Sequence, residues 1–133
     1  MEQLLLTIDF IHKKNVIHRD IKLDNILINK VDDSDQYDVK IADFGLAEFV
    51  PDSKQTKSTE IICGTPCYIA PEILRENKYS CKCDIFSLGS LCFNLLTGRY
   101  LFNGQGSNEQ LIKNRECDIS AVTRYLASTS AVC

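Results

Sequence analysis

The N-terminal part of the sequence lacks an apolar run long enough for a signal peptide or a membrane span. Its Leu4–Leu6 run stands between Glu2 and Asp9, whereas a membrane-spanning helix needs about 20 predominantly apolar residues. We therefore expect a soluble intracellular protein without a membrane partner. The cytoplasm is the expected location, with access to the nucleus left open.

An excess of positive charge is also missing. The 133 residues include 15 Lys or Arg and 18 Asp or Glu, which gives a formal net charge of -3 at pH 7. Nucleic acids and anionic lipids are attracted by a strongly basic surface. The charge balance therefore predicts that nucleic acid is not a partner.

Paired cysteines with zinc-ligand spacing are absent, and there are only two histidines. The cysteines are odd in number: Cys63, Cys67, Cys81, Cys83, Cys92, Cys117 and Cys133. This pattern argues against a zinc site and predicts reduced thiols that pack as small apolar side chains. A redox role for Cys63 and Cys67, which flank a predicted loop, is left open.

The first half of the sequence contains one helical pattern followed by short strand-like runs. Apolar residues recur with helical spacing up to Ile11, which predicts an amphipathic helix that ends before Asn15. β-type runs at 16–17, 26–28 and 39–42 predict short strands, with a polar, turn-rich stretch over 29–38. Residues 48–62 have no sustained period and predict a long loop, a feature that is usually functional.

The second half is predicted to be mainly helical. Pro71 suits the first turn of a short helix. Ser80 is a candidate cap for a second long helix, over about 81–97, which Gly98 ends. Since this segment is apolar around most of its circumference, we expect it to be buried at the centre of the domain. A further helix is expected near 108–115, followed by an indistinct end.

Three short motifs carry residues suited to phosphoryl transfer. They are His18–Asn25 (HRDIKLDN), Asp43–Gly45 (DFG) and Ala70–Glu72 (APE). An aspartate that orients a hydroxyl, a lysine that neutralises a phosphate, and an asparagine and a second aspartate that hold magnesium are the parts this reaction needs. Their order and spacing predict a phosphotransferase.

With Gly64–Glu72 and Asp84–Gly89, these motifs make the sequence resemble the C-terminal lobe of a eukaryotic protein kinase of the serine/threonine type. Phe86 stands where that family usually has tryptophan. The resemblance implies an α+β fold, predominantly helical, with short antiparallel strands around the catalytic loop. It implies a partial kinase domain over 1–133, truncated at both ends, with catalytic loop 18–25, activation segment 43–72 and central helix about 81–97. The N-terminal lobe and the final helices are expected to be absent.

The resemblance assigns the catalytic and cofactor residues. Asp20 is the expected base that aligns the substrate hydroxyl, Lys22 meets the γ-phosphate of ATP, and Thr65 bonds to both. Asn25 and Asp43 are the expected Mg²⁺ ligands. The family's apolar floor under adenine corresponds to Leu27, with Ala42 just before the magnesium aspartate, although a strand leucine can also be core.

Other matched residues are implied to support the loop or to regulate it. His18 is expected to pack beneath the catalytic loop, and Asp84 to accept backbone hydrogen bonds that hold its shape. Glu72 is expected to lack the arginine with which the family pairs it.

Arg19 can pair with a phosphate placed on the activation segment by an activating kinase. The candidates are Thr56, Ser58 and Thr59, and the alternative is that these hydroxyl groups only solvate the loop. The position that is often the phosphorylated threonine in the family is Ile61 here.

The implied function is transfer of the γ-phosphate of ATP, with Mg²⁺, to serine or threonine hydroxyl groups of protein substrates. Because the glycine-rich loop, the strand lysine with its helix glutamate, and the adenine hinge are not among these residues, we expect the 133-residue chain alone to have negligible activity. The alternatives are a noncatalytic kinase-like binding module and a truncated gene product. Retention of Asp20, Lys22, Asn25 and Asp43 argues against the binding module.

Overall fold

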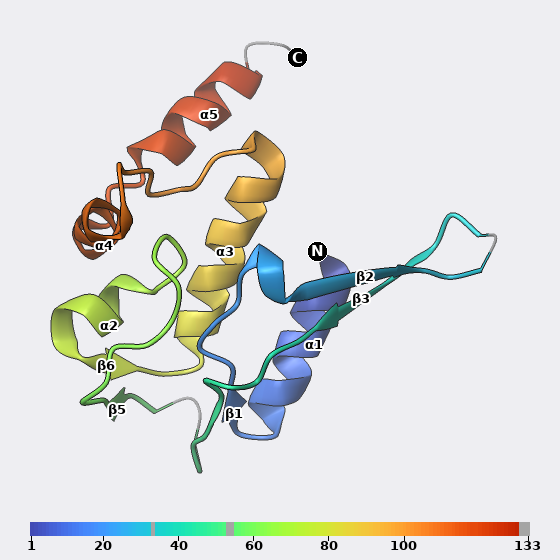
Figure 1. The fold of residues 1–133 in the computed structure, drawn as a ribbon, viewed down its shortest axis with the longest axis horizontal. Coiled ribbons are helices and arrows are strands. Elements are labelled where there is room, and N and C mark those ends of the chain that lie inside the picture. The colour runs from blue at the N-terminus through green and yellow to red at the C-terminus, as the bar shows by residue number, and fades with distance from the viewer. Residues whose placement is uncertain (33, 53–54, 131–133) are drawn as a thin grey trace.

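The computed structural model describes residues 1–32, 34–52 and 55–130, which form helices and short paired strands (Figure 1). The helical elements are α1 (Glu2–Lys13), η1 (Leu23–Asn25, a 3-10 turn), α2 (Pro71–Glu76), α3 (Lys82–Thr97), α4 (Ser107–Glu116) and α5 (Ser120–Ser130). The strands are β1 (Val16–Ile17), β2 (Ile26–Lys30), β3 (Tyr37–Ile41), β4 (Glu48–Phe49), β5 (Lys57–Ser58) and β6 (Lys78–Tyr79). The predominance of helices with short antiparallel strands agrees with the predicted class.

Helix α3 lies between α1 on one side and α2 with α4 on the other (Figure 1). Its Leu88 and Leu91 pack in a buried cluster with Leu4, Ile8 and Ile11 of α1. The helix ends where Gly98 takes a left-handed conformation with φ 68°, as the sequence predicts. The apolar stripes of α1 and α3 therefore build the core beneath the catalytic loop.

One expectation for α3 is wrong. The helix is not buried around its circumference, because Ile85, Leu95 and Leu96 are 48%, 57% and 64% exposed. The apolar composition of a helix does not show which of its faces are covered by neighbouring elements. Helix α1 covers only the face of α3 that carries Leu88 and Leu91. Ser80 lies one residue before the N-cap position, which Cys81 holds. Its hydroxyl accepts from the backbone N–H of Lys82 at 3.4 Å, so Ser80 takes part in capping the first turn.

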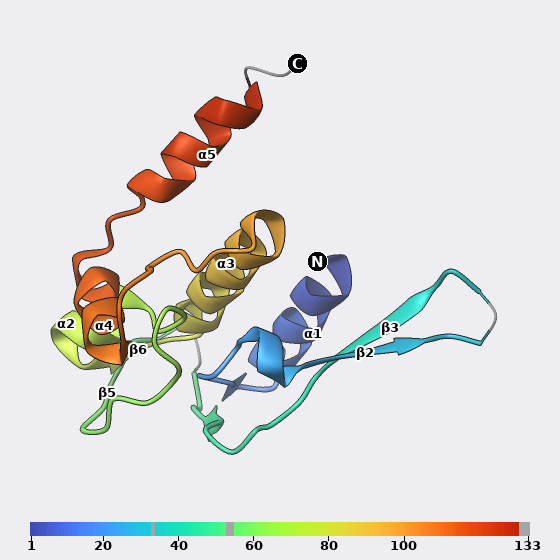
Figure 2. The ribbon, with the colours of Figure 1, turned by 45° about the horizontal axis from the view of Figure 1, so that its top comes forward.

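Three antiparallel strand pairs are present in the described residues. The β2–β3 hairpin runs in register from Ile26 opposite Ile41 to Lys30 opposite Tyr37, so both strands extend into the stretch predicted as turn. Figure 2 shows this hairpin projecting from the helical body. The other pairs are β1–β4 and β5–β6. They place two short strands in the described part of the predicted loop, 48–52 and 55–62, whereas 53–54 lie outside the described residues.

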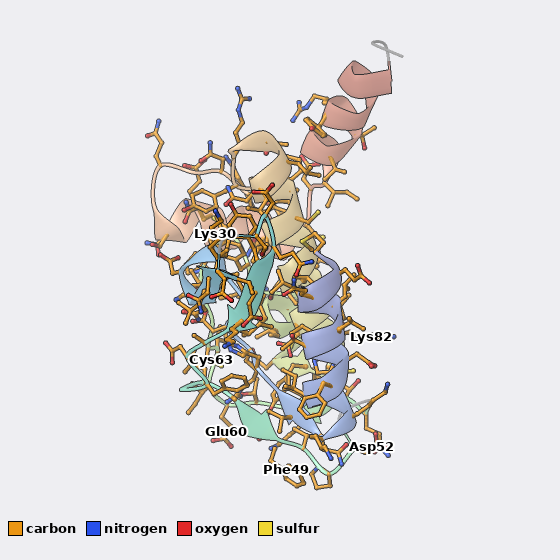
Figure 3. All side chains as sticks on the ribbon, turned by 90° about the vertical axis from the view of Figure 1, so that its right-hand side faces the viewer. Lys30, Phe49, Asp52, Glu60, Cys63 and Lys82 are labelled. Atoms are coloured by element: carbon orange, nitrogen blue, oxygen red, sulfur yellow. The ribbon has the colours of Figure 1, made fainter. Side chains whose placement is uncertain are left out.

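The β1–β4 pair lies at the C-terminal end of α1. Val16 is opposite Phe49, and the backbone N–H of Val50 donates to the carbonyl of Asn15 at 2.8 Å. Figure 3 places Phe49 and Asp52 beside that end of α1. This pairing brings the segment that follows the DFG motif back to the start of the catalytic loop.

Within the stretch predicted to be indistinct, residues Ser120–Ser130 form α5, and 131–133 lie outside the described residues. The ring of Tyr125 lies 6.2 Å from that of Phe93, edge to face, and its hydroxyl donates to the carbonyl of Leu96 at 3.5 Å. These contacts attach α5 to the end of α3.

The six cysteines that lie in the described residues are free thiols, and Cys133 lies outside them. In the same part of the chain, no helix has the length and apolar character to cross a membrane. Nor does that part hold a group of three or more His, Cys, Asp or Glu side chains arranged to bind a metal.

Substitution of Leu91 by alanine is expected to lower the free energy of unfolding by about 2 to 5 kcal/mol, because Leu91 is fully buried and its removal leaves a cavity in the core. Leu96→Ala is the matched control, since it makes the same change on the same helix at a side chain that is 64% exposed. We expect the control to change the free energy by less than about 0.5 kcal/mol. Urea unfolding measures both, and equal losses would contradict the assignment of the core.

Candidate active site

The backbone of the catalytic loop is held by Asp84 of α3, whose carboxylate is fully buried. Oδ2 accepts from the backbone N–H of His18 at 2.9 Å, and Oδ1 accepts from that of Arg19 at 2.8 Å. Oδ2 also accepts from Nε2 of His12 at 2.8 Å. Because Arg19 has φ 67°, a conformation that side-chain-bearing residues rarely adopt, these bonds help to fix the turn that presents Asp20.

His18 joins the catalytic loop to the segment before the DFG motif. Its ring is buried, with Nε2 3.1 Å from the carbonyl of Ala42 and Nδ1 3.3 Å from the backbone nitrogen of Asp20. Since a carbonyl can only accept, Nε2 carries the proton and Nδ1 accepts from Asp20. The ring also lies 4.7 Å from that of Phe44. His18 is thus placed beneath the loop, where it contacts both motifs.

The side chains of Asp20, Lys22, Asn25 and Thr65 meet in one cluster. The Thr65 hydroxyl donates to Asp20 Oδ1 at 2.6 Å, and Lys22 Nζ lies 2.9 Å from Asp20 Oδ2 and 3.1 Å from the Thr65 oxygen. Asn25 Nδ2 donates to the backbone carbonyl of Asp20 at 2.9 Å and to its Oδ2 at 3.3 Å. The cluster brings Thr65, 45 positions along the chain from Asp20, to the catalytic loop.

The cluster favours the charged forms of its acid and its base. Burial raises the pKa of Asp20, but hydrogen bonds from Thr65, Lys22 and Asn25 outweigh it and leave that pKa below its ordinary value. The hydrogen bond to Asp20 raises the pKa of Lys22 despite partial burial. A carboxylate oxygen has two lone pairs, so the ionised Asp20 keeps capacity for a further donor such as a substrate hydroxyl.

The two expected magnesium ligands lie at the same end of the β2–β3 hairpin, where Ile26 is opposite Ile41. The backbone N–H of Ala42, directly before Asp43, donates to the carbonyl of Asn25 at 2.8 Å, so the two segments run side by side. Asp43 is exposed and has φ 59°, and its Oδ1 accepts from the N–H of Gly45 at 3.1 Å. Asn25 uses its amide nitrogen on Asp20, which leaves its Oδ1 for a ligand. A carboxylate and an amide oxygen are the hard donors that Mg²⁺ favours, so this donor set fits the metal.

Gly45 leaves room for the Asp43 carboxylate beside the backbone of the DFG segment. A Cβ there would lie 3.0 Å from the Asp43 carboxylate oxygen, closer than most real contacts. Glycine therefore lets the carboxylate approach the backbone.

Leu27 and Ala42, predicted to lie near adenine, are on the hairpin beside the cluster. Leu27 is 50% exposed, so the alternative that it is a core residue is wrong. Ala42 is half-buried. The structure thus presents an open apolar side chain next to the two expected magnesium ligands.

Arg19 lies in a second cluster, which lines a cavity of about 440 Å³. Its Nε donates to the carbonyl of Leu46 at 2.7 Å, and its Nη1 lies 2.8 Å from Oε2 of Glu48. Lys57, Ser58, Thr59, Glu60, Cys63 and Tyr79 are among the residues that line the same cavity.

Two of the candidate phosphorylation sites, Ser58 and Thr59, therefore reach the cavity of Arg19. Thr56 is not among its lining residues. The Thr59 hydroxyl donates to the carbonyl of Ile61 at 2.8 Å. Of the two cysteines considered for a redox role, Cys63 lines this cavity, whereas Cys67 is buried and donates its thiol to the carbonyl of Phe102 at 3.1 Å. Burial raises the pKa of the Cys67 thiol to about 11, which makes it a poor nucleophile.

Sequence reasoning missed Glu48, Lys57 and Tyr79. Each lies outside the recognised motifs, and they meet only because β4 and β5 fold back on the catalytic loop. No periodic signal in 48–62 predicts that contact.

Glu72, the acid of the APE motif, is half-buried and lies near Cys83. Burial raises the pKa of the Cys83 thiol, and the carboxylates of Asp84 and Glu72 raise it further. Within residues 1–32, 34–52 and 55–130 no cation lies within ion-pair distance of Glu72.

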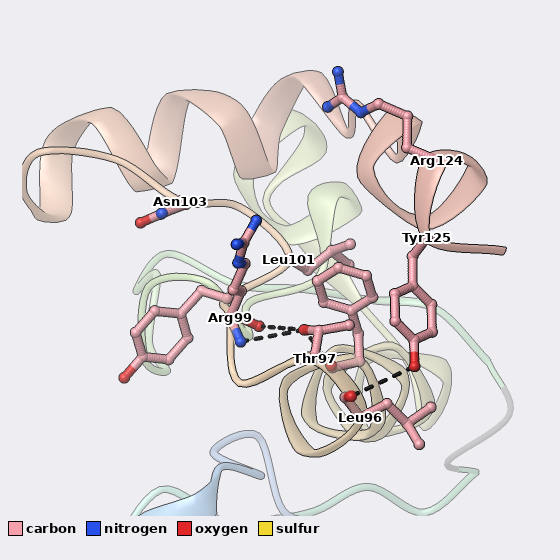
Figure 4. A pocket seen from close by; sticks show the side chains of 9 residues that line it. Leu96, Thr97, Arg99, Leu101, Asn103, Arg124 and Tyr125 are labelled. Carbon is pink, nitrogen blue, oxygen red and sulfur yellow. Dashed lines mark hydrogen bonds between the residues drawn. The ribbon is translucent and has the colours of Figure 1, made fainter. Parts of the chain in front are cut away.

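A cavity of about 630 Å³ is lined by no residue of these motifs (Figure 4). It lies between the end of α3, the 99–103 connection and α5, and is lined by residues that include Arg99, Tyr100, Arg124 and Tyr125. A smaller cavity of about 180 Å³ borders Thr65 and Asp24. We therefore base the candidate reactive site on the hydrogen-bonded cluster around Asp20 and not on cavity size.

Comparison with known proteins, like the geometry of the Asp20 cluster, points to a protein kinase. The family described as "Protein kinase domain" matches residues 1–131. A probable serine/threonine-protein kinase 2 of Plasmodium falciparum is 38% identical over 130 residues, 98% of this chain and 24% of the relative. Serine/threonine-protein kinase zyg-8 of Caenorhabditis elegans is 43% identical over 103 residues, 77% of this chain and 12% of the relative.

Serine/threonine-protein kinase 33 of the mouse is 36% identical over 122 residues, 87% of this chain and 25% of the relative. The chain thus spans about a quarter or less of these relatives' lengths. Because the family match extends over nearly the whole sequence and the relatives carry serine/threonine kinase names, this chain belongs to the protein kinase domain family.

Proposed function

We propose that this chain supplies the C-terminal, catalytic-loop lobe of a kinase that transfers the γ-phosphate of ATP to serine or threonine hydroxyl groups of protein substrates. The observation that carries the proposal is the cluster in which Asp20 contacts Thr65 at 2.6 Å and Lys22 at 2.9 Å. An ionised acid, a cation and a hydroxyl in mutual contact suit the alignment of a nucleophile beside a phosphate.

In this mechanism the Asp20 carboxylate accepts a hydrogen bond from the substrate hydroxyl and aligns it for in-line attack. As the new P–O bond forms, the bond from the γ-phosphorus to the β–γ bridging oxygen breaks and ADP leaves, while the hydroxyl proton passes to Asp20. Lys22 stabilises the negative charge on the phosphoryl oxygens, and Asn25 fixes Asp20 through its two hydrogen bonds. Asn25 and Asp43 would hold Mg²⁺, which when bound would neutralise charge on the ATP phosphates and orient them.

Lys22 and Thr65 also support serine/threonine specificity. The resemblance to the kinase family implies this specificity, because tyrosine kinases of the family usually have a different catalytic-loop pattern, with alanine and arginine in the part where this chain has Lys22. In this chain Lys22 Nζ donates to the Thr65 hydroxyl, and this contact ties the loop to the stretch that would receive the residues beside the target. The proposed partners are therefore proteins with exposed serine or threonine side chains.

The isolated 133 residues are proposed to have negligible activity. They contain no G-x-G-x-x-G loop to cover the ATP phosphates, and the single G-x-G, at Gly104–Gly106, has no strand before it. Measurable turnover by the isolated chain, abolished by Asp20→Asn, would contradict this proposal.

Asp43→Asn, made in the full-length gene product, is expected to weaken Mg²⁺-dependent ATP binding by about tenfold or more, because an amide replaces an anionic ligand of the metal. Asp38→Asn is the matched control: it makes the same change at an exposed carboxylate of β3 that pairs with Lys40. We expect the control to bind as the unsubstituted protein does. Calorimetric titration with ATP, with and without Mg²⁺, provides the measurement. Absence of Mg²⁺-dependent ATP binding in the unsubstituted protein would favour the noncatalytic binding module instead.

A further inference from the structure

The guanidinium of Arg19, next to the proposed base, already has an anionic partner within the chain. Nη1 lies 2.8 Å from Glu48 Oε2, with side-chain exposures of 15% for Arg19 and 26% for Glu48. The guanidinium also lies over the ring of Tyr79, 5.2 Å from its centroid. An ion pair that is partly buried and has further contacts contributes more to stability than an exposed pair does.

Glu48 connects the catalytic loop to the activation segment. One carboxylate oxygen, Oε2, accepts from Arg19 and from the hydroxyl of Tyr79 in β6, and the other, Oε1, is paired with Lys57 in β5. Three segments separated along the chain therefore meet at a single carboxylate. The β5–β6 pairing, with Lys57 opposite Tyr79, holds two of these partners in register.

The surroundings keep Glu48 ionised. Hydrogen bonds from Lys57 and then Tyr79 lower its pKa, and they outweigh the opposite effect of partial burial, with Arg19 adding to the decrease. Arg19 and Lys57 together carry two positive charges, so the cluster requires an anion.

We propose that Glu48 is a positioning residue for catalysis, whose carboxylate holds Arg19 and thereby the Asp20 loop against the activation segment in the absence of phosphorylation. The proposal rests on the proposed kinase function. Its alternative is that a phosphate on Ser58 or Thr59, which line the same cavity, is needed to provide the negative charge.

The route from Glu48 to Asp20 is short. Arg19 is directly before Asp20, and its left-handed backbone (φ 67°) is held by Asp84 while its side chain is held by Leu46 and Glu48. Loss of the Glu48 charge leaves Lys57 and Arg19 unneutralised and frees one end of this attachment. A displacement of about 1 Å at a reacting group can lower a rate by about 10²-fold.

The test compares Glu48→Gln, Glu48→Asp and Glu60→Gln with the unsubstituted full-length gene product, each treated with phosphatase before assay. We expect Glu48→Gln to lower kcat by about tenfold or more with little change in KM for ATP, and Glu48→Asp to restore part of the loss. Glu60→Gln, the same change at another residue lining the cavity, should stay within about threefold of the unsubstituted protein. The triple variant Thr56→Ala, Ser58→Ala, Thr59→Ala is also expected to retain kcat.

Hydrogen exchange of the amides in 55–63 supplies a readout that does not need activity. We expect faster exchange there in Glu48→Gln and not in Glu60→Gln. If the unsubstituted protein has no kinase activity, the proposed function fails, and this exchange comparison still decides the role of Glu48.

Retention of kcat by Glu48→Gln overturns the proposal, as does loss of activity on phosphatase treatment of the unsubstituted protein. If Glu48→Gln does not fold, Lys57→Met replaces it, because that variant removes one partner of the same carboxylate. A kcat change below about threefold in Lys57→Met would then overturn the proposal.

Discussion

Asp20→Asn in the full-length gene product is expected to lower kcat for phosphoryl transfer by about 10²- to 10⁴-fold, the range found for removal of a general base. Asparagine has nearly the same shape, and its carbonyl oxygen can still accept from the Thr65 hydroxyl. The amide nitrogen that takes the place of Oδ2 cannot accept a proton from the substrate. It also faces the Nζ of Lys22, which lies 2.9 Å from Oδ2 in the unsubstituted protein. Steady-state transfer from ATP to a serine-containing protein, with kcat and KM resolved, provides the measurement.

The two kinetic constants distinguish alignment of the substrate hydroxyl from binding of ATP. Loss of alignment lowers kcat, whereas loss of ATP binding raises KM. Asp20 is not expected to hold ATP, so KM for ATP should stay within about threefold. Asp38→Asn, an exposed carboxylate paired with Lys40, is again the control and should leave both constants unchanged. If Asp20→Asn keeps more than about a tenth of kcat, Asp20 is not the base.

The parts of the site that could be predicted from sequence are those whose residues are close along the chain. His18, Asp20, Lys22 and Asn25 lie within eight consecutive positions, so their types and spacing indicate a chemistry directly. Thr65 is distant and was assigned only by resemblance, yet the fold brings its hydroxyl to 2.6 Å from Asp20.

The helices α1 and α3 were predictable for a related reason. Apolar residues repeat along each of them at the spacing of one helical face, and burial of Ile8 and Leu91 follows from that repeat. The repeat does not reveal whether a second face has a neighbour, which is why the exposure of Leu95 and Leu96 was not predicted.

The contacts of the activation segment could not be predicted by such means. Glu48 meets Tyr79 31 positions away and Lys57 nine positions away, and the strands that bring them together are two residues long. Pairs this short have no alternation to detect, and their stability comes from tertiary contacts. The contact of His12 with Asp84 could not be predicted either, because it joins two helices across 72 positions of the sequence.

Asp84→Asn is expected to lower the free energy of unfolding by about 3 to 5 kcal/mol, the cost typical of breaking a buried charged network by changing one partner. The carboxylate of Asp84 is fully buried and accepts from three donors: the backbone N–H groups of His18 and Arg19, and Nε2 of His12. Asparagine keeps the volume but replaces one accepting oxygen with a donating NH₂ group, so at least one of these N–H groups is left facing another donor.

Unfolding in urea provides the measurement, and Asp9→Asn is the control, because Asp9 is an exposed carboxylate whose partner is Lys13 one turn away on α1. An exposed pair of this kind contributes about 0.3 to 0.5 kcal/mol, so the control should remain near the unsubstituted protein. We also expect the folded fraction of Asp84→Asn to lose kcat, because Arg19 is held in its left-handed conformation partly by Asp84. A change below about 1 kcal/mol in Asp84→Asn would show that the loop keeps its shape without this carboxylate. The turn that presents Asp20 would then have to be fixed by His18 and by the contacts of Arg19 with Leu46 and Glu48.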